Sequence, residues 1–225
     1  VRFSVQLGFE IEAQTWAAVK RHAASLSKVS VERIRDELTK ILTSAEPARG
    51  IRLLDEAGLL KVFLPEMEVM KGVEQPSEYH PEGDVFIHTL MLLDGLKPNP
   101  PFELALGCLL HDVAKPATFE RAADRIRFHG HDVLGAKMSR EICHRLAISN
   151  DQTDLICELV EHHLRFKDSF QMRLATLKRF MSLARFDLHL ELHRVDCMAS
   201  HGKLEAYHFM SAKYEEFLKL PPPPL

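Results

Sequence analysis

The chain has 225 residues and 46% hydrophobic residues, enough for a globular protein with one or two domains. Its formal net charge of −3 excludes a globally basic nucleic-acid-binding protein, so contact with nucleic acid would need a local patch. No apolar run reaches the roughly 18 residues that a membrane-spanning helix needs, and no signal peptide is visible. These features predict a cytoplasmic protein without membrane contact.

The first residues lack an initiator Met and look like the middle of a helix, which suggests that a preceding segment was removed. Residues 15–26 carry apolar side chains at helical spacing, and Ser30 is a candidate N-cap for a helix over residues 31–42. Residues 47–60 predict another short helix, which stops near Gly58. The N-terminal part is therefore expected to be a set of helices.

Glycine and proline in residues 71–83 mark the predicted boundary between two parts of the chain. A hairpin is expected around Ala123 and Asp124, in the charged segment 118–130. Ser149 and Gln152 form a capping box that opens a further helix. Helices are also expected over residues 176–184 and 186–200.

The four cysteines have no C-x-x-C spacing and lie in apolar segments with helical periodicity. A disulfide framework and a zinc knuckle both require close or paired cysteines. We therefore predict buried, reduced thiols at Cys108, Cys143, Cys157 and Cys197.

The central motif is the apolar run of residues 104–110, followed by His111-Asp112 and then Lys115. An imidazole beside a carboxylate is a donor set suited to transition metals. If the run forms a packed helix, both side chains reach a cavity at its end, because Pro116 disfavours further helix. Lys115 would then place a positive charge beside a bound phosphate. A His-Asp pair alone is common, so this interpretation depends on further ligands.

Further candidate ligands recur among the 13 histidines, at intervals that place one on each successive predicted helix. A metal that prefers oxygen also needs carboxylate, which favours a downstream Asp over the neighbouring histidines His189 and His193. The additional candidates are His88, His131, His162, His163 and Asp196.

Four of these candidates have open alternatives. His88 shares a helix face with apolar residues, so it could instead be a core histidine bonded to a carbonyl. His131 competes with His129 for the same position. The sequence does not distinguish His162 from His163: one of the pair could bind metal while the other contacts phosphate.

The order of a lone His, His-Asp, a His, a His pair and a distant Asp resembles the HD superfamily of metal-dependent phosphohydrolases, over about residues 80–200. The resemblance implies a divalent metal (Mg, Mn, Fe, Co, Ni or Zn). About five or six ligands suit one octahedral ion, or two ions that share Asp112. It also implies hydrolysis by a metal-activated hydroxide, with catalytic roles for Asp112 and Lys115 and a forked phosphate contact from Arg165.

Residues 1–66 carry a second resemblance, in segments such as Leu7-Gly8-Phe9-Glu10-Ile11 and Val29-Ser30-Val31-Glu32-Arg33-Ile34. They look like the neck and body of the class II tRNA nucleotidyltransferase and bacterial poly(A) polymerase family. The resemblance implies nucleotide or RNA contacts by Glu32, Arg33 and Glu37, although a solvated, salt-bridged helix face would show the same spacing. The family's catalytic head would precede residue 1, so nucleotidyl transfer is not expected of this sequence.

We therefore expect an all-α chain with a neck/body bundle over residues 1–66, an HD helical bundle over 67–220 and a proline-rich tail over 221–225. The first functional hypothesis is hydrolysis of phosphomonoesters or phosphodiesters of nucleotides or RNA 3′ ends, including 2′,3′-cyclic phosphates. The alternative is a tRNA- or RNA-binding body module with a non-catalytic HD site. The complete ligand set favours the first hypothesis, and the oligomeric state is not determined by the sequence.

Overall fold

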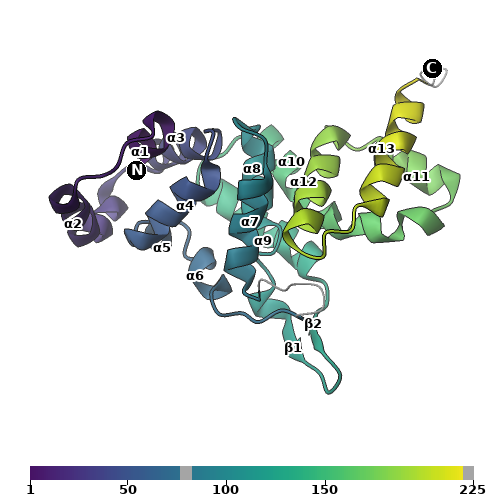
Figure 1. The fold of residues 1–225 in the computed structure, drawn as a ribbon, viewed down its shortest axis with the longest axis horizontal. Coiled ribbons are helices and arrows are strands. Elements are labelled where there is room, and N and C mark those ends of the chain that lie inside the picture. Colours follow the sequence, from purple (N-terminus) through teal and green to yellow (C-terminus); the bar gives the residue numbers. More distant parts are fainter. Residues whose placement is uncertain (77–82, 220–225) are drawn as a thin grey trace.

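The computed structural model describes residues 1–76 and 83–219, and the predicted tail at 221–225 lies outside them. These residues are mostly helical, and the predicted all-α class is confirmed (Figure 1). The helices lie in an elongated arrangement, with the N-terminal helices at one end, α7 to α10 in the middle, and α11 and α13 at the other end.

The N-terminal part contains a series of short helices. The predicted helix at 15–26 divides in two, because its second half winds as a 3₁₀ helix, while the predicted helix at 31–42 is present with Ser30 at its N-cap position. The elements are α1 (Arg2–Leu7), α2 (Ala13–His22), the 3₁₀ helix η1 (Ala23–Lys28), α3 (Val31–Leu42), α4 (Pro47–Glu56), α5 (Leu60–Phe63) and α6 (Glu66–Met70).

The second part begins with α7 and contains the longer helices. The Ser149 hydroxyl accepts a hydrogen bond from the Gln152 backbone N–H at 3.4 Å, which confirms the predicted start of α10. The elements are α7 (Val85–Gly95), α8 (Phe102–Leu110), η2 (Pro116–Thr118), α9 (His131–Arg145), α10 (Asn150–His162), η3 (His163–Gln171), α11 (Leu174–Met181), α12 (Phe186–Ala199) and α13 (Glu205–Leu218).

The predicted hairpin is present as the antiparallel pair β1 (Phe119–Arg121) and β2 (Ile126–Phe128). It projects from the helical body beneath α9 (Figure 1). Its strands do not belong to a larger sheet, since β1 pairs with β2 alone among the described residues. The hairpin connects the segment after α8 to the first residue of α9.

The two parts of the chain share one hydrophobic core. A continuous cluster of buried side chains runs from Leu38 in α3 to Ala199 in α12, and α4 packs against α7. A smaller second cluster surrounds Phe166, Phe180 and Phe186 near α11 and α13. The N-terminal helices therefore support the helices that carry the candidate ligands.

Close packing of α8, α9 and α10 depends on two glycines. A Cβ atom on Gly107 would lie 3.1 Å from Leu159 Cδ1, and one on Gly135 would lie 3.1 Å from Val160 Cγ1. These distances are shorter than ordinary van der Waals contacts, so Leu159 and Val160 would have to shift by a few tenths of an ångström to admit a larger residue. The glycines thus let the end of α8, the start of α9 and the end of α10 meet.

All four cysteines are free and buried, which confirms the prediction. Burial raises the pKa of the Cys143 and Cys197 thiols to about 12. Across residues 1–76 and 83–219, every helix falls short of the length and apolarity that a membrane span requires.

Candidate metal centre

Asp112 lies at the centre of the candidate site, just beyond the end of α8, with 1% of its side chain exposed. Its Oδ2 atom lies 3.1 Å from His111 Nε2 and 3.9 Å from His88 Nε2. Its Oδ1 atom lies 3.3 Å from His131 Nε2 and 3.9 Å from His163 Nε2. Each carboxylate oxygen therefore faces its own pair of imidazole nitrogens.

Three of these histidines are held in the same way. His111 Nδ1 lies 2.8 Å from the Cys108 carbonyl oxygen, His131 Nδ1 lies 2.7 Å from that of Phe128, and His163 Nδ1 lies 2.6 Å from that of Val160. Because a carbonyl only accepts hydrogen bonds, each Nδ1 must carry the proton and donate it. Each Nε2 then has a free lone pair directed at the centre, as in metal-binding histidines.

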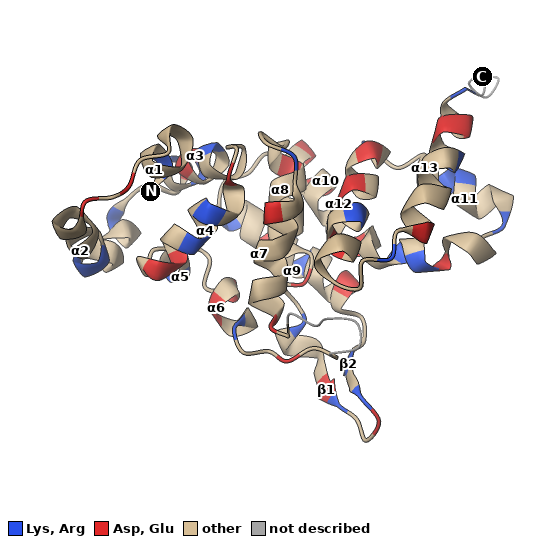
Figure 2. Cartoon of the chain, viewed as in Figure 1, with Lys and Arg blue, Asp and Glu red and all other residues tan. Residues whose placement is uncertain are grey.

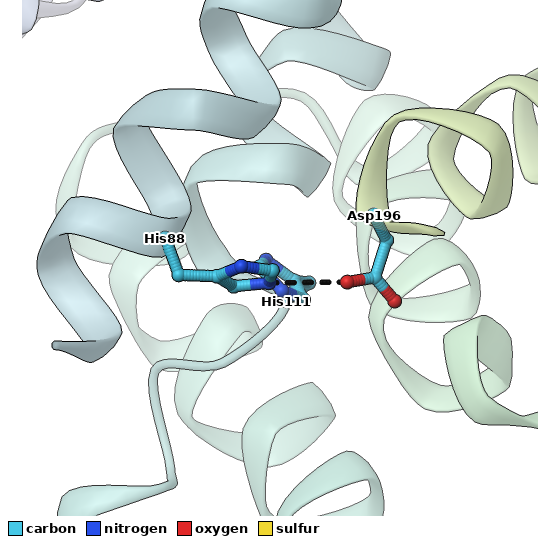
Figure 3. A group of neighbouring side chains, drawn as sticks. All are labelled: His88, His111 and Asp196. Atoms are coloured by element: carbon cyan, nitrogen blue, oxygen red, sulfur yellow. Dashed lines mark hydrogen bonds and ion pairs between the residues drawn. The ribbon is translucent and has the colours of Figure 1, made fainter. Parts of the chain in front are cut away.

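His88 in α7 and Asp196 in α12 bring two distant segments together. Figure 3 shows the two side chains pointing toward each other, beside His111. His88 Nε2 lies 3.0 Å from Asp196 Oδ1. Asp196 is 19% exposed, whereas His88 is fully buried, so Asp196 lies at the boundary between the buried centre and solvent. A ligand set here includes residues that are 108 positions apart.

The donor atoms form two groups, each with its members within 4.8 Å of one another: His88, His111 and Asp196 in one, and Asp112, His131 and His163 in the other. Two ligands of one ion lie about 3.0–3.4 Å apart when metal bonds are about 2.1 Å long. The His111 and His131 Nε2 atoms and Asp112 Oδ1 are buried without a hydrogen-bond partner among the described residues. Buried polar atoms without partners are costly, so this donor set fits a divalent ion, or two ions that share Asp112.

Lys115 adds a positive charge beside Asp112. Its Nζ lies 2.7 Å from Asp112 Oδ2 and donates to Gln75 Oε1 at 2.5 Å, and the residue is 5% exposed. Burial alone would raise the pKa of the Asp112 carboxyl, but His111 and Lys115 outweigh burial and hold that pKa well below its usual range. Asp112 is therefore ionised, which is the form that binds metal.

The His163 imidazole is held neutral. Burial lowers the pKa of His163 to about 3, and the nearby His111 ring lowers it further in the same direction. A neutral imidazole offers its lone pair to a metal, whereas a protonated ring does not. The centre therefore combines a neutral nitrogen donor at His163 with an ionised carboxylate at Asp112.

The structure separates the adjacent pair of histidines. His163 belongs to the Asp112 group, but the His162 ring packs against Phe180 and His189, with centroid distances of 6.3 Å to each, and belongs to neither group. His162 is the last residue of α10 and points elsewhere because adjacent helical side chains project about 100° apart. We therefore withdraw His162 from the expected ligand set.

Arg165 also lies away from the centre. Its guanidinium carbon lies 5.0 Å above the Phe180 ring, and it does not line the hollow at the metal centre. The forked phosphate contact expected of Arg165 therefore has no support from its position. Lys167, two residues further along η3, lines the hollow instead, as does His129, which belongs to neither ligand group.

His189 and His193 lie beside the second hydrophobic cluster. His193 stacks on Phe166 at 4.3 Å between ring centroids, and His189 packs on Phe186 at 6.0 Å. Burial lowers the pKa of His189 to about 3, and the nearby His162 adds to this shift while Asp187 opposes it. His189 is therefore a packing residue that stays neutral in the folded protein.

This burial predicts acid sensitivity. Unfolded His189 gains a proton below pH about 6.5, whereas folded His189 stays neutral down to about pH 3, so its stabilising contribution is present above pH 6.5 and is lost as the pH falls. Between pH 8 and pH 5, the free energy of unfolding should therefore fall by up to about 2 kcal/mol more in the wild type than in His189→Phe. Urea unfolding of both proteins at the two pH values measures this, and an equal loss in the variant would contradict it.

The neck residues lie in α3, away from the metal centre (Figure 1). Glu37 pairs with Arg2 at 2.5 Å and with Lys40 at 3.2 Å, and Arg33 and Glu37 line a mainly apolar hollow of about 230 Å³. Glu32 is exposed. A salt-bridged helix face accounts for the contacts of Glu37.

Several residues around the site were not anticipated from the sequence. Gln75 comes from the predicted boundary segment, and its amide oxygen holds Lys115. Arg125, Arg127 and Lys167 line the hollow above the centre. Clustered charge in residues 118–130 was the available signal for the two arginines, whereas no local pattern indicated Gln75 or Lys167.

Comparison with known proteins places these two parts in families. Residues 84–185 match the HD domain family, and residues 8–71 match the family described as "Probable RNA and SrmB- binding site of polymerase A". The match to the HD family includes five of the converging side chains: His88, His111, Asp112, His131 and His163. The second part of the chain is an HD domain.

Similar proteins extend this result to the rest of the chain. A CC-adding tRNA nucleotidyltransferase of Thermus thermophilus is 34% identical over 99% of this chain and 53% of its own length. An A-adding tRNA nucleotidyltransferase of Deinococcus radiodurans is 39% identical over 72% of this chain and 39% of its own length. The chain therefore belongs to the tRNA nucleotidyltransferase and poly(A) polymerase family, and it spans about half the length, or less, of these curated relatives.

Proposed function

We propose that this chain is a metal-dependent phosphohydrolase whose HD domain cleaves phosphomonoester or phosphodiester bonds of nucleotides or RNA 3′ ends, including 2′,3′-cyclic phosphates. The observation that supports this most directly is the position of Asp112, with a pair of histidine nitrogens facing each of its oxygens. A decayed site would be expected to have lost at least one ligand, and all the donors are present here.

His88, His111 and Asp196 would hold one divalent ion, and His131 and His163 would hold a second, with Asp112 shared between them. Such ions supply Lewis acidity for phosphoester hydrolysis. Asp112 fixes the spacing of the two groups, and the carbonyl-bound Nδ1 atoms fix the orientation of the imidazoles.

Lys115 would stabilise negative charge on the phosphate oxygens. Its ammonium lines the hollow and is already held by Asp112 and Gln75, so little reorganisation is needed for a phosphate oxygen to become its next partner. Burial strengthens this interaction because water does not screen it. Lys115 therefore keeps the phosphate role that the sequence suggested for it, whereas the position of Arg165 does not support a second phosphate contact there.

The N-terminal part would supply the contact with RNA. Residues 8–71 match a family described as a probable RNA-binding site, and the names of two similar proteins refer to tRNA. These matches support tRNA or another RNA as the partner, with Glu32, Arg33 and Glu37 as candidate contacts. The alternative function, an RNA-binding module with a non-catalytic HD site, would share this partner.

The two functions predict different results in one assay. The purified chain, stripped of metal and then supplied separately with Mg, Mn, Fe, Co, Ni or Zn, should hydrolyse cytidine 2′,3′-cyclic phosphate with at least one of these metals, because the donor set accepts both nitrogen- and oxygen-preferring ions. Activity should vanish with chelator and return on metal addition. RNA binding without hydrolysis under any of these metals would instead support the non-catalytic alternative.

A further inference from the structure

A hollow of about 310 Å³ opens directly above the metal centre. Asp112, His131 and Asp196 line it from the centre, and two other elements contribute to its walls: the β1–β2 hairpin and η3. This volume is at the lower limit of about 300 Å³ for ligand pockets, so it suits one nucleotide-sized group. Any longer chain attached to that group must run outward over the rim.

The rim carries a local excess of positive charge. Arg125 and Arg127 come from the hairpin and Lys167 from η3, and the carboxylates that line the hollow, Asp112 and Asp196, are candidate metal ligands. The part of the chain that the structure describes offers Lys167 no carboxylate partner. Figure 2 shows blue, basic segments along the β2 side of the hairpin. The chain as a whole is acidic, so this rim differs from the bulk charge.

The arginines of the hairpin are only weakly neutralised. Arg127 pairs with Asp124 at 2.8 Å, and Arg125 Nε lies 3.9 Å from the same carboxylate. Asp124 is 60% exposed, and exposed pairs contribute little net energy. One carboxylate shared by two arginines leaves the hairpin with a net positive charge. A phosphodiester group at the rim would therefore be attracted.

One wall of the hollow is apolar. Phe128 lines it beside Ile126 and Leu164, and its ring lies edge-on to the His131 ring, 6.3 Å between centroids. Lys115 Nζ lies over one face of the Phe128 ring, 5.3 Å from its centre, and the Phe119 ring packs edge-on against Phe128 at 5.8 Å between centroids. An aromatic face beside a phosphate-binding cation is a common platform for a nucleobase. The hollow thus offers an apolar surface next to the position expected for the reacting phosphate. The cations of the rim lie further out.

We propose that this hollow selects the terminal nucleotide of a single-stranded polynucleotide over a free mononucleotide. The terminal base would lie against Phe128, and Arg125, Arg127 and Lys167 would bind the next phosphate along the chain. The inference rests on the proposed hydrolase function and specifies its substrate class. The rim residues would bind the polynucleotide beyond the phosphate that reacts, and would not contact that phosphate.

The test compares two substrates that differ by one nucleotide. The ratio of kcat/KM for a cytidine dinucleotide ending in a 2′,3′-cyclic phosphate to that for cytidine 2′,3′-cyclic phosphate should exceed 10 in the metal-loaded wild type, since only the dinucleotide carries a second phosphate that the rim can bind. Lys167→Gln and Arg125→Gln should each lower this ratio several-fold. Arg140→Gln removes the same charge from the distant surface of α9 and should leave the ratio unchanged.

A binding experiment separates this inference from the proposed function. The probe is a fluorescein-labelled cytidine tetranucleotide with a 3′-phosphate, and its anisotropy is followed at several salt concentrations. Each rim substitution should weaken binding and reduce the salt dependence of log Kd by about 0.7, because one phosphate contact is lost. If the rim substitutions weaken binding but no hydrolysis is detected, the proposed hydrolase function is refuted and the proposed binding role of the rim is supported. Binding and substrate ratios equal to those of the Arg140→Gln control would overturn the inference.

Discussion

Asp112→Ala should reduce phosphoester hydrolysis at least about 100-fold, because residues that merely support metal ligands already contribute about 10- to 100-fold. The substitution removes both carboxylate oxygens that face the four histidine nitrogens, so both ion positions lose their shared ligand. It also removes the carboxylate that pairs with Lys115, whose hydrogen bond to Gln75 remains, and this alters the charge balance at the centre. The measurements are kcat/KM on cytidine 2′,3′-cyclic phosphate and the metal content of the protein.

The matched control is Asp154→Ala on the surface of α10. Asp154 is 66% exposed and pairs with Arg140, so its loss should leave both hydrolysis and metal content unchanged. Circular dichroism of each variant establishes whether the fold is kept. Hydrolysis that survives Asp112→Ala, with contaminating phosphatase excluded, would rule out the centre proposed here.

His163→Ala and His162→Ala should give opposite results, although the two residues are adjacent. His163 belongs to the Asp112 group, so its loss should lower bound metal from about two ions to about one per chain and reduce hydrolysis. His162 packs against Phe180 and His189, so its loss should leave the metal content at about two ions. Elemental analysis after dialysis against metal-free buffer measures the stoichiometry.

This pair also tests how many ions the centre holds. A metal content of about one ion in the wild type, abolished completely by His163→Ala, would favour a single-ion centre with the same ligands. If His162→Ala and His163→Ala lose the same amount of metal, the assignment of His163 as a ligand and of His162 as a packing residue would be contradicted. Thermal melting without metal distinguishes ligand loss from unfolding, since His162 contributes packing as well.

Much of the local structure followed from sequence because its causes are local. Ser149 and Gln152 predicted the start of α10, and the hairpin lies where it was predicted, around Ala123 and Asp124. The helix over residues 31–42 matched its predicted bounds, since apolar periodicity and capping operate within one element. In contrast, η1 replaced the second half of the helix expected at 15–26, because propensity does not separate α from 3₁₀ turns.

The order of His and Asp residues along the chain identified the type of site, because ligand chemistry is a property of residue type. Which atoms converge was decided by tertiary structure. His162 and His163 are equivalent in sequence, and only the exit direction of the chain from α10 directs one of them to Asp112 and the other to Phe180. Arg165 and Lys167 differ in the same way, since η3 directs Arg165 to Phe180 and Lys167 to the hollow.

The sequence by itself therefore determined the helical class, the two families and the chemical nature of the ligands. The folded chain alone decided that Asp112 presents one oxygen to each histidine pair, that Gln75 holds Lys115, and that basic residues of the hairpin and η3 surround one hollow. It also decided the contact between His88 and Asp196, which lie 108 positions apart. Contacts at such separation depend on how helices pack across a shared core, and no local sequence pattern encodes that packing.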